Sequence, residues 1–186
     1  IITFLNFLVN VLNAIIQIGN EERGDKSMKS IVIYFSRAGY NYVNGEIKYL
    51  EIGNTEVIAK KIAELTNSDI FKIEPMLAYS EDYSECIEEA RQDQKAGARP
   101  ELKEYPDNLE KYDVIYLGYP NYWGTMPMVM FTFLENAKLT NKIIKPFCSH
   151  EGSGLGRSEE DIRKLCNNCI VEKGLAIHGV NYDEEV

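Results

Sequence analysis

Residues 30–39 read SIVIYFSRAG, and residues 53–65 read GNTEVIAKKIAEL. The first stretch begins with a short apolar, β-branched run, which is typical of a strand buried on both faces. The second stretch has four apolar side chains at helical spacing, which would share one face: Val57, Ile58, Ile62 and Leu65. A loop therefore joins a buried strand to a helix N-terminus, where unpaired backbone N–H groups and the helix dipole favour an anionic ligand.

The alternation of strand and helix continues along the chain. Further strands are predicted at residues 69–74, 112–118, 143–149 and 171–177, and further helices at residues 81–95, 127–134 and 158–166, the last of them capped by Ser158. Because strands that alternate with helices form crossover units, we expect an α/β fold with a doubly wound, five-stranded parallel sheet and helices on both faces. Ligands bind such sheets beyond the carboxyl ends of the strands, here in the loops after Phe35, Gly118 and Ser149.

The loop after the first strand contains Ser36, Arg37 and Gly39, and Asn54 and Thr55 lie where it enters the helix. The Ser36 and Thr55 hydroxyl groups could donate hydrogen bonds to phosphate oxygens. No lysine follows a glycine as in a Walker motif, and the sequence has no G-x-G-x-x-G, which disfavours nucleoside triphosphates and dinucleotides. The alternative is a plain turn in which Thr55 is the helix N-cap.

The loops after the third and fourth strands carry the other candidate binding residues. The second loop is rich in aromatic residues whose rings could cover a flat conjugated ligand or, alternatively, cap the core: Pro120, Asn121, Tyr122, Trp123 and Gly124. The third loop has glycines that would leave backbone amides open to a ligand, and its candidates are Glu151, Gly152 and Gly154. Neither His150 nor His178 has an evident partner that would make it a catalytic base, so we identify no catalytic residue.

The chain has 186 residues, enough for one compact domain with appendages, and it is acidic, with a net charge of −9. This charge argues against nucleic acid or an anionic membrane as the main partner. It favours partner proteins with a basic docking face, as in transient redox pairs, although acidity that only aids solubility explains the charge equally well.

Four scattered cysteines are too few for a disulfide framework, which indicates a reducing compartment such as the cytoplasm: Cys86, Cys148, Cys166 and Cys169. Cys166 and Cys169 have C-x-x-C spacing, but they lie at the end of a predicted helix, whereas a redox pair opens one. No second cysteine or histidine pair completes a metal site. We therefore interpret this pair as free thiols and predict no metal.

The two ends of the chain differ from its centre. Residues 1–18 carry no charge and have one narrow polar stripe, which predicts a helix, and residues 20–27 read as a polar linker. We interpret residues 1–27 as an extension of a domain at residues 28–186 that lacks most of its C-terminal helix. We expect the N-terminal helix to fill the place of that missing helix, in its own subunit or a neighbouring one; a membrane anchor and packing elsewhere are the alternatives.

Residues 28–182 resemble the flavodoxin family. The resemblance is carried by Tyr34-Phe35-Ser36, Thr55-Glu-Val-Ile-Ala59, Pro120-Asn-Tyr-Trp-Gly124 and Glu151-Gly-Ser-Gly154. It implies the strand order 2-1-3-4-5 and FMN bound without a covalent link. The residues that would then hold the phosphate are Ser36, Arg37, Asn54 and Thr55. Residues 120–124 would flank the isoalloxazine with Tyr122 or Trp123 as the stacking ring, and the third loop would approach the opposite edge of the ring.

The family pattern is interrupted between the two halves of the first loop. Residues 40–52 contain Asn44-Gly45, a hairpin signal, so we expect an insert that lies over the phosphate or the ribityl chain.

Three functional hypotheses follow. The first is an FMN-dependent electron carrier, the second is an enzyme on the same scaffold that reduces quinones or similar acceptors with NAD(P)H, and the third is an interaction module without flavin. No nicotinamide site is identifiable in the sequence, which favours the carrier. An oligomer is compatible with each hypothesis.

Overall fold

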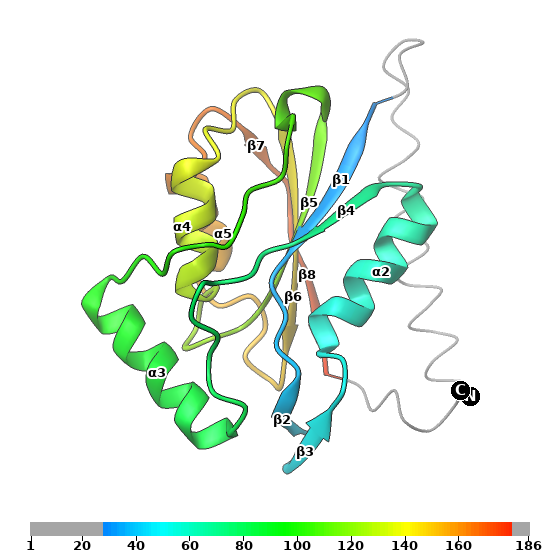
Figure 1. Ribbon diagram of the computed structural model, residues 1–186. Coiled ribbons are helices and arrows are strands. Elements are labelled where there is room, and N and C mark those ends of the chain that lie inside the picture. Colours follow the sequence, from blue (N-terminus) through cyan, green and yellow to red (C-terminus); the bar gives the residue numbers. More distant parts are fainter. Residues whose placement is uncertain (1–27, 180–186) are drawn as a thin grey trace.

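The computed structural model describes residues 28–179, which form a parallel sheet with helices on both faces (Figure 1). Its strands are β1 (Ser30–Tyr34), β4 (Asp69–Lys72), β5 (Val114–Pro120), β6 (Ile143–His150), β7 (Ile170–Val171) and β8 (Leu175–His178). They hydrogen-bond in the order β4-β1-β5-β6-β7, with β8 also paired to β6, and every pair is parallel. The α/β class and the predicted order 2-1-3-4-5 are therefore confirmed.

The predicted fifth strand is in fact two short strands, so the sheet formed by residues 28–179 has six strands instead of five. β7 pairs with Ile143 and Ile144, and β8 pairs with β6 from Phe147 onward. Glu172 N donates to Ile144 O at 3.0 Å, and the next bond of a parallel ladder would need an N–H from residue 146. Pro146 has no N–H, so the pairing stops there.

Helices pack on the sheet through two separate cores. α2 (Asn54–Thr66) covers one face, where its Ile58 and Ile62 join a cluster with Val32. α4 (Met128–Asn136) and α5 (Ser158–Leu165) cover the other face and the larger core, to which Phe133 and Ile162 belong. A short 3-10 helix, Leu109–Lys111, precedes β5. The helices thus lie on both faces, as the alternation of strand and helix predicts.

Two further elements stand apart from the sheet, at the end of the molecule where the central strands reach their carboxyl ends (Figure 1). α3 (Tyr83–Ala96) contacts α4 and strand β2. β2 (Gly39–Val43) and β3 (Glu46–Leu50) form an antiparallel hairpin. Its turn residues Asn44 and Gly45 have φ values of 51° and 89°, the left-handed conformation that a two-residue hairpin turn requires. The predicted hairpin is therefore confirmed.

The alternative in which Thr55 is the helix N-cap is wrong. α2 begins at Asn54, with Gly53 as its N-cap residue. The Thr55 hydroxyl lies 2.7 Å from Ser149 Oγ at the end of β6. The Thr55 hydroxyl therefore forms a tertiary hydrogen bond and does not cap the helix.

The prediction that Ser158 caps the last helix is also wrong, because Arg157 is the N-cap residue of α5. The Ser158 hydroxyl donates to Leu155 O at 2.6 Å and accepts from the Tyr119 hydroxyl at 2.8 Å. Tyr119 is fully buried, so its hydroxyl needs a partner inside the protein. Ser158 supplies that partner.

The helix predicted at residues 1–18, the linker after it and the chain end at residues 180–186 lie outside the described residues. The roles assigned to them stay predictions. Within residues 28–179, no helix combines the length and apolar character needed to cross a membrane.

Gly118→Ala tests the packing of β5 against β6. A Cβ on Gly118 would lie 2.1 Å from Cζ of Phe147, whose side chain is buried. We expect the substitution to lower the free energy of unfolding by about 1–3 kcal/mol, the usual cost of overpacking a core. Urea denaturation followed by circular dichroism measures this loss.

Phe147→Leu in the Gly118→Ala background is the control, because it removes the clashing ring. The double variant should be more stable than the sum of the two single losses predicts. Losses that add to within about 0.5 kcal/mol would contradict the proposed contact.

Candidate functional site

The three loops predicted to bind a ligand meet at one cavity, at the carboxyl ends of β1, β5 and β6. Its volume is about 450 Å³, within the range of about 300–1,000 Å³ typical of small-molecule sites. Most of the predicted residues line it: Ser36, Arg37, Asn54, Thr55, Pro120, Asn121, Tyr122, Trp123, Gly124 and Glu151. Segments far apart in the chain therefore build a single concave site.

The remaining predicted residues, Gly39, Gly152 and Gly154, do not line the cavity. Gly154 O accepts a hydrogen bond from Asn121 Nδ2 at 2.8 Å, and Gly152 N donates to His150 Nδ1 at 2.9 Å. Gly39 begins the hairpin with a φ of 91°. In the structure these three glycines contribute to the backbone geometry of the loops. Their contact with a ligand stays a prediction.

The two halves of the first loop touch at Gly53. A Cβ on Gly53 would lie 2.3 Å from Arg37 O and 2.4 Å from Ser36 Oγ, so this approach requires glycine. Ser36 Oγ accepts a hydrogen bond from Glu56 N in the first turn of α2, at 3.1 Å. Since its oxygen is the acceptor there, the Ser36 hydroxyl keeps its proton for a ligand at the helix N-terminus.

Thr55 links the first loop to the third. Both Thr55 and its partner Ser149 are buried, yet both line the cavity. Only one of the two hydroxyl groups donates in their hydrogen bond, so the other keeps its proton for a ligand. Together with the first N–H groups of α2, which have no intrahelical acceptor, these hydroxyl groups form a donor set suited to a phosphate.

The Arg37 guanidinium holds protein segments together. Its Nη1 donates to Ser80 O at 2.9 Å and to Glu81 O at 3.1 Å, and its Nη2 donates to Tyr40 O and, at 3.4 Å, to Asn41 Oδ1. Its Nε is buried and has no partner among the described residues. Arg37 therefore brings positive charge to the cavity, but its two terminal nitrogens are not free for a bidentate contact with phosphate.

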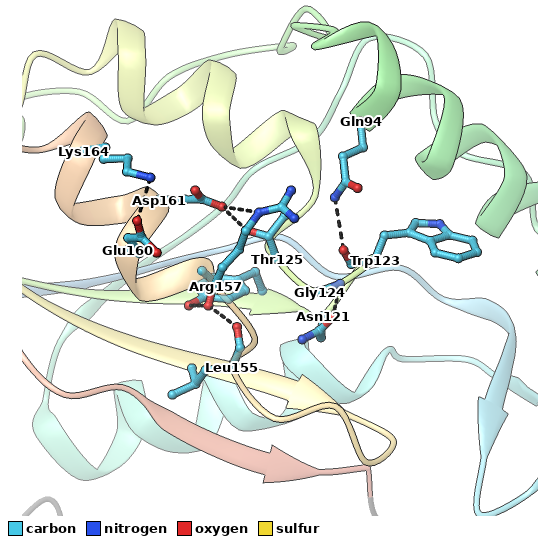
Figure 2. A network of polar contacts seen from close by, with 12 residues as sticks. Gln94, Asn121, Trp123, Gly124, Thr125, Leu155, Arg157, Glu160, Asp161 and Lys164 are labelled. Atoms are coloured by element: carbon cyan, nitrogen blue, oxygen red, sulfur yellow. Dashed lines mark hydrogen bonds and ion pairs between the residues drawn. The ribbon is translucent and has the colours of Figure 1, made fainter.

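The second loop is a tight turn that is fixed to the third loop. Tyr122 N donates to Thr125 O at 2.8 Å, and Trp123 and Gly124 between them have positive φ. The Asn121 side chain accepts from Gly124 N at 2.9 Å (Figure 2) and donates to the third loop as described above. Because both ends of its amide are occupied by protein, Asn121 orients the turn.

The same turn is also attached to α5. A Cβ on Gly156 would lie 2.2 Å from Gly124 O, and Arg157 N donates to that oxygen at 2.8 Å. Asp161 Oδ2 accepts from Thr125 Oγ1 at 2.6 Å and from Arg157 Nε at 3.3 Å (Figure 2). The turn that carries Trp123 therefore has a rigid base.

The two aromatic rings of the second loop have different surroundings. Trp123 projects from the turn (Figure 2), with 47% of its surface exposed. Its Nε1 donates to Ile87 O of α3 at 2.8 Å. Tyr122 packs edge-on against Phe35 and Tyr79, and burial raises the pKa of its hydroxyl. Tyr122 is thus a fixed wall of the cavity, and Trp123 offers a more accessible ring.

Several residues that line the cavity were not predicted as site residues from the sequence: Asn41 and Tyr42 from the hairpin, Tyr83, Ile87 and Ala90 from α3, and Ser149, His150 and Ser153 from the third loop. The hairpin and the third loop were both predicted to lie near the ligand. The cavity residues in these two segments could therefore have been predicted from their position in the sequence. α3 carries no motif that places it here, because its position depends on its packing against α4 and β2.

The structure pairs two histidines whose partners are not evident in the sequence. His150 and His178 are opposite each other in the β6–β8 register, with ring centroids 5.6 Å apart. Glu151 Oε2 lies 4.0 Å from His178 Nε2 and accepts a hydrogen bond from Asn44 N at 3.0 Å. Burial and the neighbouring His178 lower the pKa of His150, which favours its neutral form.

The four cysteines are free thiols. Burial raises the pKa of Cys148 and of Cys166 to about 12, so neither is a thiolate at neutral pH. Residues 28–179 contain no cluster of histidine, cysteine and acidic side chains arranged to hold a metal ion.

Solved structures with this fold include two from Bacteroides. A protein from Bacteroides eggerthii DSM 20697 that carries the name flavoprotein is 25% identical, with a TM-score of 0.68 over 81% of this chain and 89% of that one. A protein of the same name from Bacteroides uniformis ATCC 8492 is 25% identical, with a TM-score of 0.65 over 84% and 94% of the two chains. No curated protein matches this sequence significantly.

A flavoprotein from Lactobacillus acidophilus NCFM, solved in complex with FMN, has the same fold at 18% identity, with a TM-score of 0.63 over 82% of this chain and 94% of that one. The flavodoxin family matches residues 47–186, which include α2 and both the second and third loops. This match agrees with the strand order of the sheet and with a cavity at the carboxyl ends of its central strands. The chain belongs to the flavodoxin family.

Proposed function

We propose that this protein binds FMN noncovalently and transfers electrons through it. The observation that carries the proposal is the meeting of three loops in one cavity, beside the N-terminus of α2 and at the carboxyl ends of β1 and β5. The chain turns in opposite directions from β1 and β5 along the sheet, and doubly wound sheets bind their cofactors at such a switch point. The FMN complex of the Lactobacillus acidophilus flavoprotein, which shares the fold, supports this choice of ligand.

The polar end of the cavity fits a phosphate and a ribityl chain. Ser36, Asn54 and Thr55 would donate hydrogen bonds to the phosphate, and Arg37 would add positive charge. Glu151 Oε1 is buried and has no donor among residues 28–179. A buried carboxylate oxygen needs such a donor, and a ribityl hydroxyl group would supply it.

The aromatic end of the cavity fits the isoalloxazine ring. Trp123 would stack on the ring, and Tyr122 would form the wall beside it. FMN, when bound, supplies the redox chemistry by accepting and releasing electrons. The residues of the chain bind, orient and shield the ring, and the net charge of −9 disfavours additional negative charge on it.

The acidic net charge of the chain is consistent with an electron carrier whose partner protein has a basic docking face.

One observation favours the second candidate, an NAD(P)H-dependent quinone reductase. Ile87 and Ala90 of α3 give the cavity an apolar side wall, which could receive a flat, uncharged acceptor.

Anaerobic reduction of the purified, FMN-loaded protein separates the candidates. A carrier should be reduced by dithionite and reoxidised by a basic acceptor protein such as cytochrome c, without oxidation of NAD(P)H. Rapid oxidation of NAD(P)H in the presence of a quinone would support the reductase. Failure to quench FMN fluorescence at micromolar concentration would contradict both and leave the interaction module.

Thr55→Val tests whether this hydroxyl group binds the phosphate. A hydrogen bond to a charged group is worth about 1.5–3 kcal/mol, so FMN should bind about 10- to 150-fold more weakly. Riboflavin lacks the phosphate and should lose much less affinity. Fluorescence titration with both ligands measures the two losses.

Thr66→Val is the matched control, because it makes the same replacement at the far end of α2, where the hydroxyl donates to Ile62 O at 2.7 Å and the residue does not line the cavity. It should leave the ratio of FMN to riboflavin affinity near that of the wild type. Equal losses for the two ligands in Thr55→Val would show that Thr55 does not bind the phosphate.

Trp123→Ala tests the stacking ring. Stacking of a heterocycle on an aromatic side chain is worth about 1–3 kcal/mol, so FMN should bind about 5- to 150-fold more weakly. The midpoint potential should also shift, because stacking depends on the charge of the ring. Fluorescence titration and spectroelectrochemistry measure the two effects.

Trp123→Phe is the control for the loss of the indole. It keeps a ring but removes the hydrogen bond to Ile87 O, so it should remain closer to the wild type than Trp123→Ala. Wild-type affinity and potential in both Trp123→Ala and Tyr122→Ala would show that the second loop only caps the core.

A further inference from the structure

The hairpin formed by β2 and β3 is an addition to the loop between β1 and α2. The two ends of this addition already touch at its root, where a Cβ on Gly53 would lie 2.3 Å from Arg37 O. From this point the chain runs out through Gly39–Val43 and back through Glu46–Leu50. The connection from β1 to α2 therefore does not need the hairpin.

Arg37 fixes the root of the hairpin to the segment before α3. One terminal nitrogen donates to Ser80 O and Glu81 O, and the other donates to Tyr40 O in the hairpin itself. Tyr40 N in turn donates to Glu81 O at 3.0 Å. One guanidinium therefore joins two segments that are distant in the sequence.

The tip and the side of the hairpin are attached as well. Asn44 N donates to Glu151 Oε2 at 3.0 Å, which joins the turn to the third loop. Tyr42 stacks on Tyr83 of α3, with ring centroids 6.1 Å apart and the planes at 26°. Val43 is fully buried. The hairpin therefore forms a bridge from α3 to the third loop.

This bridge forms a wall of the cavity at its polar end. Asn41 and Tyr42 line the same cavity as Ser36, Asn54 and Thr55. Because the hairpin starts and ends in the loop that carries these donors, a phosphate bound there would lie against it. A second phosphate with an attached nucleoside would have to occupy the space that the hairpin fills.

We infer that the hairpin at residues 39–50 closes the phosphate end of the cavity, so that the site accepts a flavin mononucleotide, rejects a flavin dinucleotide and releases its ligand slowly. This inference rests on the proposed flavin function, and it assigns the selection between flavins to one added element.

The first test compares FMN, FAD and riboflavin by fluorescence titration. The wild type should bind FMN about tenfold or more tightly than FAD. A variant without residues 39–52, in which Ala38 precedes Gly53, should bind the two with affinities within about threefold of each other. It should also release FMN faster in stopped-flow measurements.

A point substitution gives the same test without a deletion, should the shortened chain not fold. Val43→Asp places a charge at a buried position of the hairpin and should detach it from the protein. Ile47→Asp adds the same charge at a residue that is 49% exposed, and it serves as the control. Val43→Asp should lose the preference for FMN over FAD, and Ile47→Asp should keep it, with folding checked by thermal melting.

Two outcomes would overturn the inference while leaving FMN binding intact. One is equal wild-type affinity for FMN and FAD, and the other is a preference for FMN that survives in both the deletion variant and Val43→Asp. A wild-type protein that binds none of the three flavins would instead overturn the proposed function, and the inference with it.

Discussion

The close approach of Gly53 to Ser36 and Arg37 is the contact on which the polar half of the site depends. It brings the end of β1 against the start of α2, so that Ser36 can accept from Glu56 N and Thr55 can reach Ser149. A side chain at residue 53 would force these segments apart. The donors at the helix N-terminus and the root of the hairpin would move with them.

The two halves of the cavity are held at a fixed separation by the sheet between them. The polar half is formed by the loop after β1, which leads to α2 on one face of the sheet. The aromatic half is formed by the loop after β5, which is attached to α5 on the opposite face. β1 and β5 are hydrogen-bonded neighbours, so loops that lead to opposite faces begin side by side. A ligand with an anionic end and a flat end matches this arrangement.

Much of the fold and of the site could be predicted because it depends on local patterns. β-branched runs and helical spacing identify the strands and helices, and Asn44-Gly45 identifies a turn with left-handed residues. Since parallel strands end at the same edge, predicted strand ends also locate the binding loops. The split of the last strand was not predicted. Pro146 lacks the N–H that would continue the pairing of β6 with β7, but this matters only in the strand register that the structure shows.

The sequence by itself determined the class of fold, the order of its elements and most residues of the cavity, because each follows from residues close together in the chain. Only the tertiary structure decided which partners the hydroxyl groups of Thr55 and Ser158 have, that His150 faces His178, and that α3 forms a wall of the cavity. These features depend on contacts between distant segments. Such contacts are defined only once the strand register and the packing of the helices bring the segments together.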